Sequence, residues 1–248
     1  MSDIYTAPKA DLASTREMEE FGSVEKGIAG DYSFSLGEAL SEGWQLSLSN
    51  MGTIWLSFIL YALGASAIML ILAALMWGSI SSAAGLSGML FLVILAPIAV
   101  IVIVAPLMAG SMMVSIKIAR GEKTSATEVF SYFDKIVPLG LAMFLLYFLV
   151  SIGFYLLLIP GIYLSVAYMM ALPLIVDHNL GPWQAMEASR KAITKNWFAF
   201  FGLLLVMMVI YVAGSLLFLI GLIFALPWIF ATYGVAYRQV FGAPTQNT

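Results

Sequence analysis

The chain has 248 residues, of which 62% are hydrophobic and 10% are charged, and its net charge is −3. Soluble domains are about 45–50% apolar and about 25% charged, so this composition excludes a water-soluble enzyme domain and indicates an all-α integral membrane protein. The sequence contains no cysteine and one histidine, His178, which excludes disulfides, thiolate ligands and a multi-histidine metal site built by one chain.

The first part of the chain is acidic. Residues 1–50 carry nine acidic and three basic residues, whereas residues 51–248 carry five acidic and eight basic ones. We expect residues 1–30 to form an acidic, mobile cytosolic tail, residues 31–242 to form the transmembrane domain, and residues 243–248 to form a short C-terminal tail.

Three long runs without charge follow, over residues 43–116, 136–176 and 196–237. One crossing needs about 20 apolar residues. A straight helix of 41 residues would be roughly 60 Å long, about twice the hydrocarbon thickness. Each run therefore folds back once, which predicts six transmembrane helices arranged as three hairpins.

Small and turn-forming residues mark where each run folds back. They are the segment 78–88, the Pro160-Gly161 dipeptide and Gly221. The predicted crossings are residues 54–77, 89–116, 136–159, 161–176, 197–219 and 221–237. All charges then fall at the open ends of the hairpins, and the positive-inside rule places both chain ends and both charged loops in the cytosol.

A polar segment precedes each hairpin and has helical periodicity: from Leu36 to Ser49, over residues 125–135, and from Trp183 to Trp197. Ser35 with Glu38, and Ser125 with Glu128, form capping-box patterns. We expect three cytosolic amphipathic helices that lie in the membrane interface.

Matches between the segments predict a threefold internal repeat. Ala39-Leu40…Asn50 recurs with the same spacing as Ala185-Met186…Asn196, and Pro106, Lys117 and Gly121 match Pro227, Arg238 and Gly242. The alternative is that any cytosolic segment joining two hairpins is amphipathic.

Two groups of residues are candidates for binding. Arg190, Lys191 and Lys195 cluster beside Trp197 and are candidate ligands for anionic lipid headgroups. Asp177 and His178 form a weaker polar candidate, which we expect to be solvated by water or headgroups and to face Arg190 and Lys191 across a loop. Read as a site, the pair would bind phosphate or act as acid and base; read as structure, it only ends a helix.

Residues 159–164, 171–177 and 182–190 resemble uncharacterised six-helix bacterial inner-membrane proteins. The YciC-like group and the membrane domain attached to some glycerophosphodiester phosphodiesterases are similar. The resemblance covers roughly residues 30–242 and implies the fold and a bacterial inner-membrane location. It transfers no catalytic residue, and the phosphodiesterase catalytic domain itself has no counterpart in this sequence.

The leading hypothesis is a non-enzymatic membrane scaffold, accessory or lipid-interacting protein. The alternatives are a transporter or channel for a small or amphiphilic substrate and, third, a lipid-modifying enzyme. The sequence matches no nucleotide-binding, nucleophile-elbow or zinc-protease motif, so we assign no catalytic residue, metal or cofactor. The expected partners are membrane lipids, with anionic headgroups favoured, and no nucleic acid; a homo-oligomer is compatible with small-residue spacings such as Ala105…Ala109.

Overall fold

A computed structural model describes residues 22–80, 85–216 and 220–242, and within these ranges the chain is helical with no strand. Two short 3₁₀ segments, η1 and η2, lie between α5 and α6. The helices, in chain order, are α2 (Val24–Ala29), α3 (Leu36–Ser49), α4 (Met51–Ile80), α5 (Gly85–Ala119), η1 (Ala126–Phe130), η2 (Phe133–Lys135), α6 (Ile136–Leu156), α7 (Leu158–Ala167), α8 (Ala171–Asp177), α9 (Pro182–Lys195), α10 (Trp197–Leu216) and α11 (Leu222–Phe241).

Five stretches of the described chain are long and apolar enough to cross a membrane, which makes this a multi-pass helical membrane protein. They are Met51–Leu75, Ala96–Ala119, Ala126–Leu156, Leu158–Asp177 and Trp197–Leu216. Helix α11 also has 20 residues, but most of its C-terminal half, including Thr232, Tyr233 and Tyr237, is buried among other helices. A helix shielded in this way needs less apolar surface than one that faces lipid.

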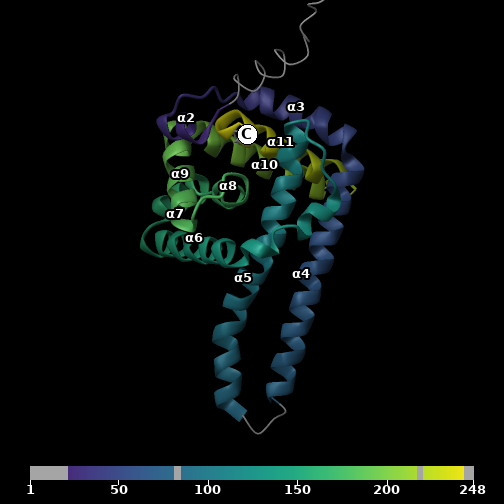
Figure 1. Cartoon of the computed structure of the whole chain (residues 1–248), viewed down its shortest axis with the longest axis vertical. Helices are drawn as coiled ribbons and strands as arrows, with labels where there is room; N and C mark the ends of the chain where they lie inside the picture. The colour runs from purple at the N-terminus through teal and green to yellow at the C-terminus, as the bar shows by residue number, and fades with distance from the viewer. Residues whose placement is uncertain (1–21, 81–84, 217–219, 243–248) are drawn as a thin grey trace, which may run out of the picture.

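The molecule has a projecting part and a packed part. The α4–α5 hairpin extends well beyond the other helices, whereas α6 runs across α5 at a steep angle (Figure 1). No residue is buried in the most apolar 18-residue window of the α4 span. The main core lies instead among α5, α6, α8, α9, α10 and α11, where Ile116, Leu174, Ile193 and Tyr237 are fully or almost fully buried.

Helices α3 and α9 are built alike. Each has 14 residues, and each ends at an asparagine, Asn50 or Asn196, directly before a long apolar helix. The fourth residue of each, Ala39 or Ala185, is completely buried. The small-residue face of α3 packs on α11: a Cβ added to Gly43 would lie 2.4 Å from Thr232 Oγ1.

The second polar segment departs from the prediction. Residues 125–135 form η1 and η2 instead of an amphipathic α-helix, and the Ser125 side chain makes no capping hydrogen bond. The reason is packing, because η1 lies against both α4 and α5 and buries Val129 completely. A Cβ on Gly110 would lie 2.6 Å from the Val129 backbone, so η1 and α5 are in close backbone contact.

The predicted turns are shifted. Leu157, which is extended, separates α6 from α7, so Pro160 and Gly161 lie inside the first turns of α7. Helix α4 continues to Ile80 and α5 starts at Gly85, so residues 78–80 and 85–88 of the predicted linker are helical, and residues 81–84 lie outside the described residues. Gly221 directly precedes α11, as expected.

The chain ends are partly described. Residues 1–21 and 243–248 lie outside the described residues, and α2 begins at Val24, so helical structure starts within the predicted tail. Ser23 caps α2 by accepting a hydrogen bond from the Lys26 N–H at 3.2 Å. Gly121 and Gly242, which follow α5 and α11 at matching positions, both have positive φ, a conformation that favours glycine.

Candidate functional site

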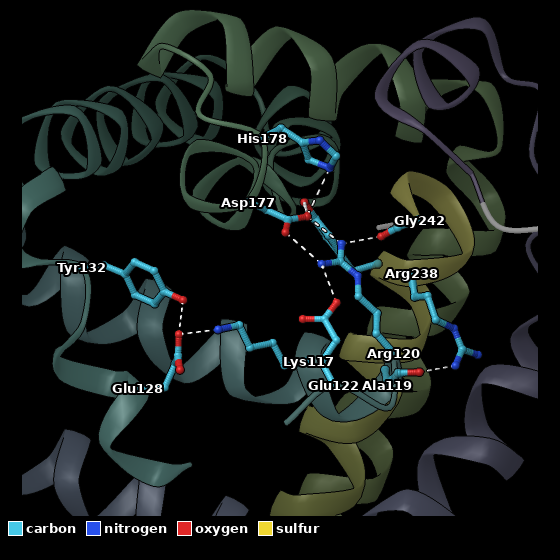
Figure 2. A network of polar contacts seen from close by, with 11 residues as sticks. Lys117, Ala119, Arg120, Glu122, Glu128, Tyr132, Asp177, His178, Arg238 and Gly242 are labelled. Carbon is cyan, nitrogen blue, oxygen red and sulfur yellow. Dashed lines mark hydrogen bonds and ion pairs between the residues drawn. The ribbon is translucent and has the colours of Figure 1, made fainter. Parts of the chain in front are cut away.

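The most buried charged pair joins the ends of α5 and α8. Arg120 Nη1 donates to Asp177 Oδ1 at 2.8 Å, and Arg120 Nη2 donates to Asp177 Oδ2 at 2.6 Å (Figure 2). Both side chains are only 4% exposed. This two-pronged contact satisfies the carboxylate in the geometry that a guanidinium favours.

Two further groups complete the Asp177 site from α11. The Tyr237 hydroxyl donates to Asp177 Oδ2 at 3.0 Å, and Arg120 Nη2 also donates to the Gly242 carbonyl that follows α11. The Arg120 guanidinium lies 5.7 Å from the centre of the Tyr237 ring. The site therefore ties the ends of α5, α8 and α11 together.

His178 and Glu122 lie at the edge of this site. His178 Nε2 is 3.1 Å from Asp177 Oδ2, although this nitrogen makes no hydrogen bond of good geometry. Glu122 Oε1 lies 3.7 Å from Arg120 Nη1, and its side chain is 41% exposed. His178 and Glu122 are thus the parts of the site nearest to solvent.

The electrostatics of the site keep Arg120 charged. Burial by itself would lower the pKa of Arg120, but the hydrogen bonds and the negative charge of Asp177 outweigh it, so the pKa is raised. A guanidinium that stays protonated and holds its carboxylate with two hydrogen bonds supplies neither a general acid nor a general base. The arrangement is chemically suited to clamping helix ends.

A second polar cluster lies beside this clamp (Figure 2). Lys117 of α5 forms an ion pair with Glu128 of η1 at 2.7 Å, and the Tyr132 hydroxyl donates to the same Glu128 oxygen. Lys135 Nζ donates to Asn179 Oδ1 at 3.0 Å and to the Val176 carbonyl at 3.3 Å, at the carboxyl end of α8. A positive charge there interacts favourably with the helix dipole.

The predicted headgroup residues lie on α9, away from Asp177. Arg190 is held by Glu187, with Nη2 2.8 Å from Oε2, and the hydrogen bonds between the two side chains, aided by their charges, raise the pKa of Arg190 and lower the pKa of Glu187. Lys191 and Lys195 are exposed. The stem of Lys195 packs against Gly30, whose added Cβ would lie 2.9 Å from Lys195 Cγ.

The expected surroundings of Asp177 and His178 are therefore wrong. The Asp177 side chain is buried, not solvated, and its partner is Arg120 and not Arg190 or Lys191. The sequence reasoning missed Arg120, Tyr237 and Lys135. One available signal was that the charged ends of the predicted hairpins, including residues 117–123 and 177–178, share one membrane face.

A broken helix adds a third polar feature. Residues 168–170 separate α7 from α8, and the buried Ser189 hydroxyl donates to the Ala167 carbonyl at 2.8 Å and accepts from the Met170 N–H at 3.2 Å. The Tyr233 hydroxyl donates to the Met169 carbonyl at 3.0 Å. These hydroxyls replace backbone hydrogen bonds that the break removes.

Within residues 22–80, 85–216 and 220–242, no group of three His, Cys, Asp or Glu residues is placed to hold a metal ion. Comparison with family models, with curated proteins and with solved structures finds no match to this chain.

Proposed function

We propose that the protein is a non-enzymatic scaffold or accessory protein of the bacterial inner membrane that works by contact with lipid. The observation that carries this proposal is the contrast between its two charged regions. Arg120 and Asp177 satisfy each other in a buried clamp, whereas Lys191 and Lys195 are exposed on α9 beside Trp197. Exposed bases at the start of an apolar helix suit anionic headgroups.

The proposed topology has six crossings, with both chain ends in the cytosol. Five long apolar stretches and the buried α11 supply the six segments. The uncharged runs support the orientation, because every base after residue 50 lies at the open ends of the hairpins.

We also propose that the six helices derive from a threefold repeat. The matched lengths of α3 and α9 support it, as do the positive-φ glycines that follow α5 and α11. In addition, the outgoing helix of each hairpin packs on the next polar segment: α5 on η1, α8 on α9, and α11 back on α3. This pattern would close the three units into a ring, with Arg120, Asp177 and Tyr237 contributed by one unit each.

Single cysteines test the topology in a chain that has none of its own. Tyr155 (91% exposed, near the α6–α7 turn) and Ile220 (66% exposed, before α11) are the positions expected to react with an impermeant maleimide from outside the cell. A cysteine at the exposed Lys123 is expected to react only after the membrane is opened. Because α6 crosses α5 steeply, protection of Tyr155→Cys from outside would overturn the six-crossing proposal.

Matched charge removals test the lipid proposal. Lys191→Gln and Lys195→Gln are each expected to reduce the phosphatidylglycerol that co-purifies with the protein, measured by lipid mass spectrometry. Lys123→Gln removes the same charge from another exposed cytosolic position and serves as the control. Equal lipid content in all three variants and the unchanged protein would overturn the α9 assignment.

The break between α7 and α8 favours a transporter as the second candidate function, because discontinuous helices form substrate sites in many transporters. In this chain, Ser189 and Tyr233 already satisfy backbone groups at the break. Ser189 is completely buried, so reaction of a cysteine at this position with a small water-soluble thiol reagent would reveal an aqueous path to the break and would support transport over the scaffold.

A further inference from the structure

An apolar groove lies between α3 and α11, apart from the clamp and from the basic surface of α9. It has a volume of about 440 Å³ and is lined by Gly37, Leu40, Ser41, Trp44 and Trp228. The two indole rings meet edge to face, with centres 5.0 Å apart. Trp44 remains 38% exposed, so one wall of the groove is open.

The walls of the groove offer almost no polar group to a ligand. The Trp228 indole N–H donates to the Leu40 carbonyl at 2.9 Å, so its hydrogen-bonding capacity is used within the protein. The Ser41 hydroxyl points back to the Glu38 carbonyl at 3.4 Å. A ligand that fits these walls is an aliphatic chain.

The position of the groove indicates where such a chain comes from. Helix α3 ends at Ser49, and the apolar span of α4 begins at Met51. On the outer face of α3, Trp44 is followed one turn later by Leu48, which is 47% exposed, and Leu56 of α4 is 50% exposed. The groove thus borders an exposed apolar surface that continues onto α4, and tryptophan side chains concentrate at membrane interfaces.

The charges around the groove indicate the headgroup. Helix α3 contains Glu38 and Glu42 and no basic residue; Glu42 is paired with Arg238 of α11 at 2.6 Å, whereas Glu38 directly follows Gly37 at the groove. An anionic headgroup would be repelled there. We propose that the groove binds one acyl chain of a zwitterionic phospholipid, a step that rests on the proposed lipid-contact function and adds a site whose headgroup preference differs from that of α9.

Two glycines allow a matched test. A Cβ added at Gly37 or at Gly52 meets nothing within 4 Å, so a side chain at either position starts in open space. Gly37→Leu fills the groove, and Gly52→Leu adds the same side chain at the start of α4, outside the groove lining. Ser41→Leu is a second filling variant at an exposed position, in case Gly37→Leu does not fold.

The full chain is reconstituted into bilayers of phosphatidylcholine that carry a diazirine on one acyl chain, and cross-links are mapped by mass spectrometry. Labelling of residues 36–48 is expected in the unchanged protein and in Gly52→Leu, and is expected to be lost in Gly37→Leu and Ser41→Leu. The same diazirine chain on phosphatidylglycerol is expected to label this segment less than on phosphatidylcholine.

Equal labelling in Gly37→Leu and Gly52→Leu would overturn the proposal. A photoreactive residue in place of Trp44 gives a second test, because cross-links from it to another protein molecule would show that a second copy occupies the groove and would also overturn the proposal. Stronger labelling by phosphatidylglycerol would overturn the headgroup assignment. The labelling of residues 36–48 does not depend on Lys191 or Lys195. If the α9 lysine variants leave the lipid content unchanged, only the α9 proposal is overturned, so failures of the two proposals can be distinguished.

Discussion

Helices α3 and α9 have the same length and the same asparagine after their last residue, but the eighth residue of each meets a different neighbour. In α3 it is Gly43, which faces Thr232 on the unbroken helix α11. In α9 it is Ser189, which faces the break between α7 and α8. An unbroken helix has its backbone groups satisfied and allows close approach, whereas a broken one requires a hydroxyl. The backbone of the neighbour thus decides which small residue fits.

Ion pairs give a second comparison between the two regions. Helix α9 packs on α8, which ends at the Arg120–Asp177 pair, and helix α3 packs on α11, which contributes Arg238 to a pair with Glu42. Arg120–Asp177 at the end of α8 is 4% exposed on both sides, whereas Glu42, which pairs with Arg238 of α11 at 2.6 Å, is 36% exposed. Arg120→Ala leaves a buried carboxylate without its partner, and we expect it to lower the free energy of unfolding by about 3–5 kcal/mol. Glu42→Gln is expected to lower it by less than about 1 kcal/mol. Thermal unfolding in detergent measures both variants, and equal shifts in melting temperature would contradict the expectation that the buried pair contributes more to stability than the exposed pair.

Adding one methyl group to α3 tests the close approach to α11. Gly43→Ala would place a Cβ 2.7 Å from the Thr232 Cα, so the two helices must separate, and we expect a loss of about 1–3 kcal/mol in unfolding free energy. Gly37→Ala, on the open side of the same helix, is expected to raise stability by up to about 1 kcal/mol. If both variants change the melting temperature in the same direction, the close contact between Gly43 and Thr232 does not hold α3 on α11.

Removing one hydroxyl from α9 tests the other half of the comparison. Ser189→Ala leaves the Ala167 carbonyl and the Met170 N–H without their bonds, and we expect a loss of about 1–3 kcal/mol in unfolding free energy. Ser47→Ala is the control on α3, because the buried Ser47 hydroxyl bonds only to the Trp44 carbonyl of its own helix. Hydrogen exchange at residues 168–171 is expected to increase in Ser189→Ala alone, and an unchanged rate would contradict the role of Ser189.

The smallest expected effect concerns charge on α9, where Glu187 pairs with Arg190 at the position that Ser41 occupies in α3. The pKa of Glu187 is lower in the folded protein than in the unfolded chain, so the pair stabilises above about pH 4.5 and its contribution disappears as the pH falls through the folded pKa. We expect at most about 0.5 kcal/mol, because the pair lies i,i+3 on a partly exposed helix face. Glu187→Gln is expected to remove this acid-dependent part of the melting curve, and an unchanged pH profile would contradict the assignment.

The sequence predicted the helical class, the start of α3 after its Ser35 cap, Pro182 in the first turn of α9 and the turn at Gly221, because these features depend on local composition and on capping residues. It failed at residues 125–135, where periodicity alone did not distinguish an α-helix from two 3₁₀ segments packed against α4 and α5. It also failed at Pro160-Gly161, where proline is accommodated in the first turn of α7 and the chain reverses at Leu157.

The candidate site was predicted only in part. Asp177 and His178 were identified from their position between an uncharged run and a loop, but the partner of Asp177 is 57 residues earlier in the chain. No periodic pattern links Arg120 to Asp177, since their contact depends on how α5 and α8 pack. The sequence likewise did not identify Tyr237 as a partner of Asp177, because a tyrosine near the end of an apolar run is also typical of an interfacial anchor.

The clamp at Arg120 has a consequence for biosynthesis. Ribosomes add about 5–20 residues per second, so Asp177 is made roughly 3–11 seconds after Arg120, and Gly242, 122 residues later, roughly 6–24 seconds after it. During that interval the nascent chain holds a guanidinium whose final partners do not yet exist, and Arg120 must stay in contact with water or headgroups. The Arg120–Asp177 pair can form once α8 has been made, whereas the contacts to Tyr237 and to the Gly242 carbonyl must wait for α11.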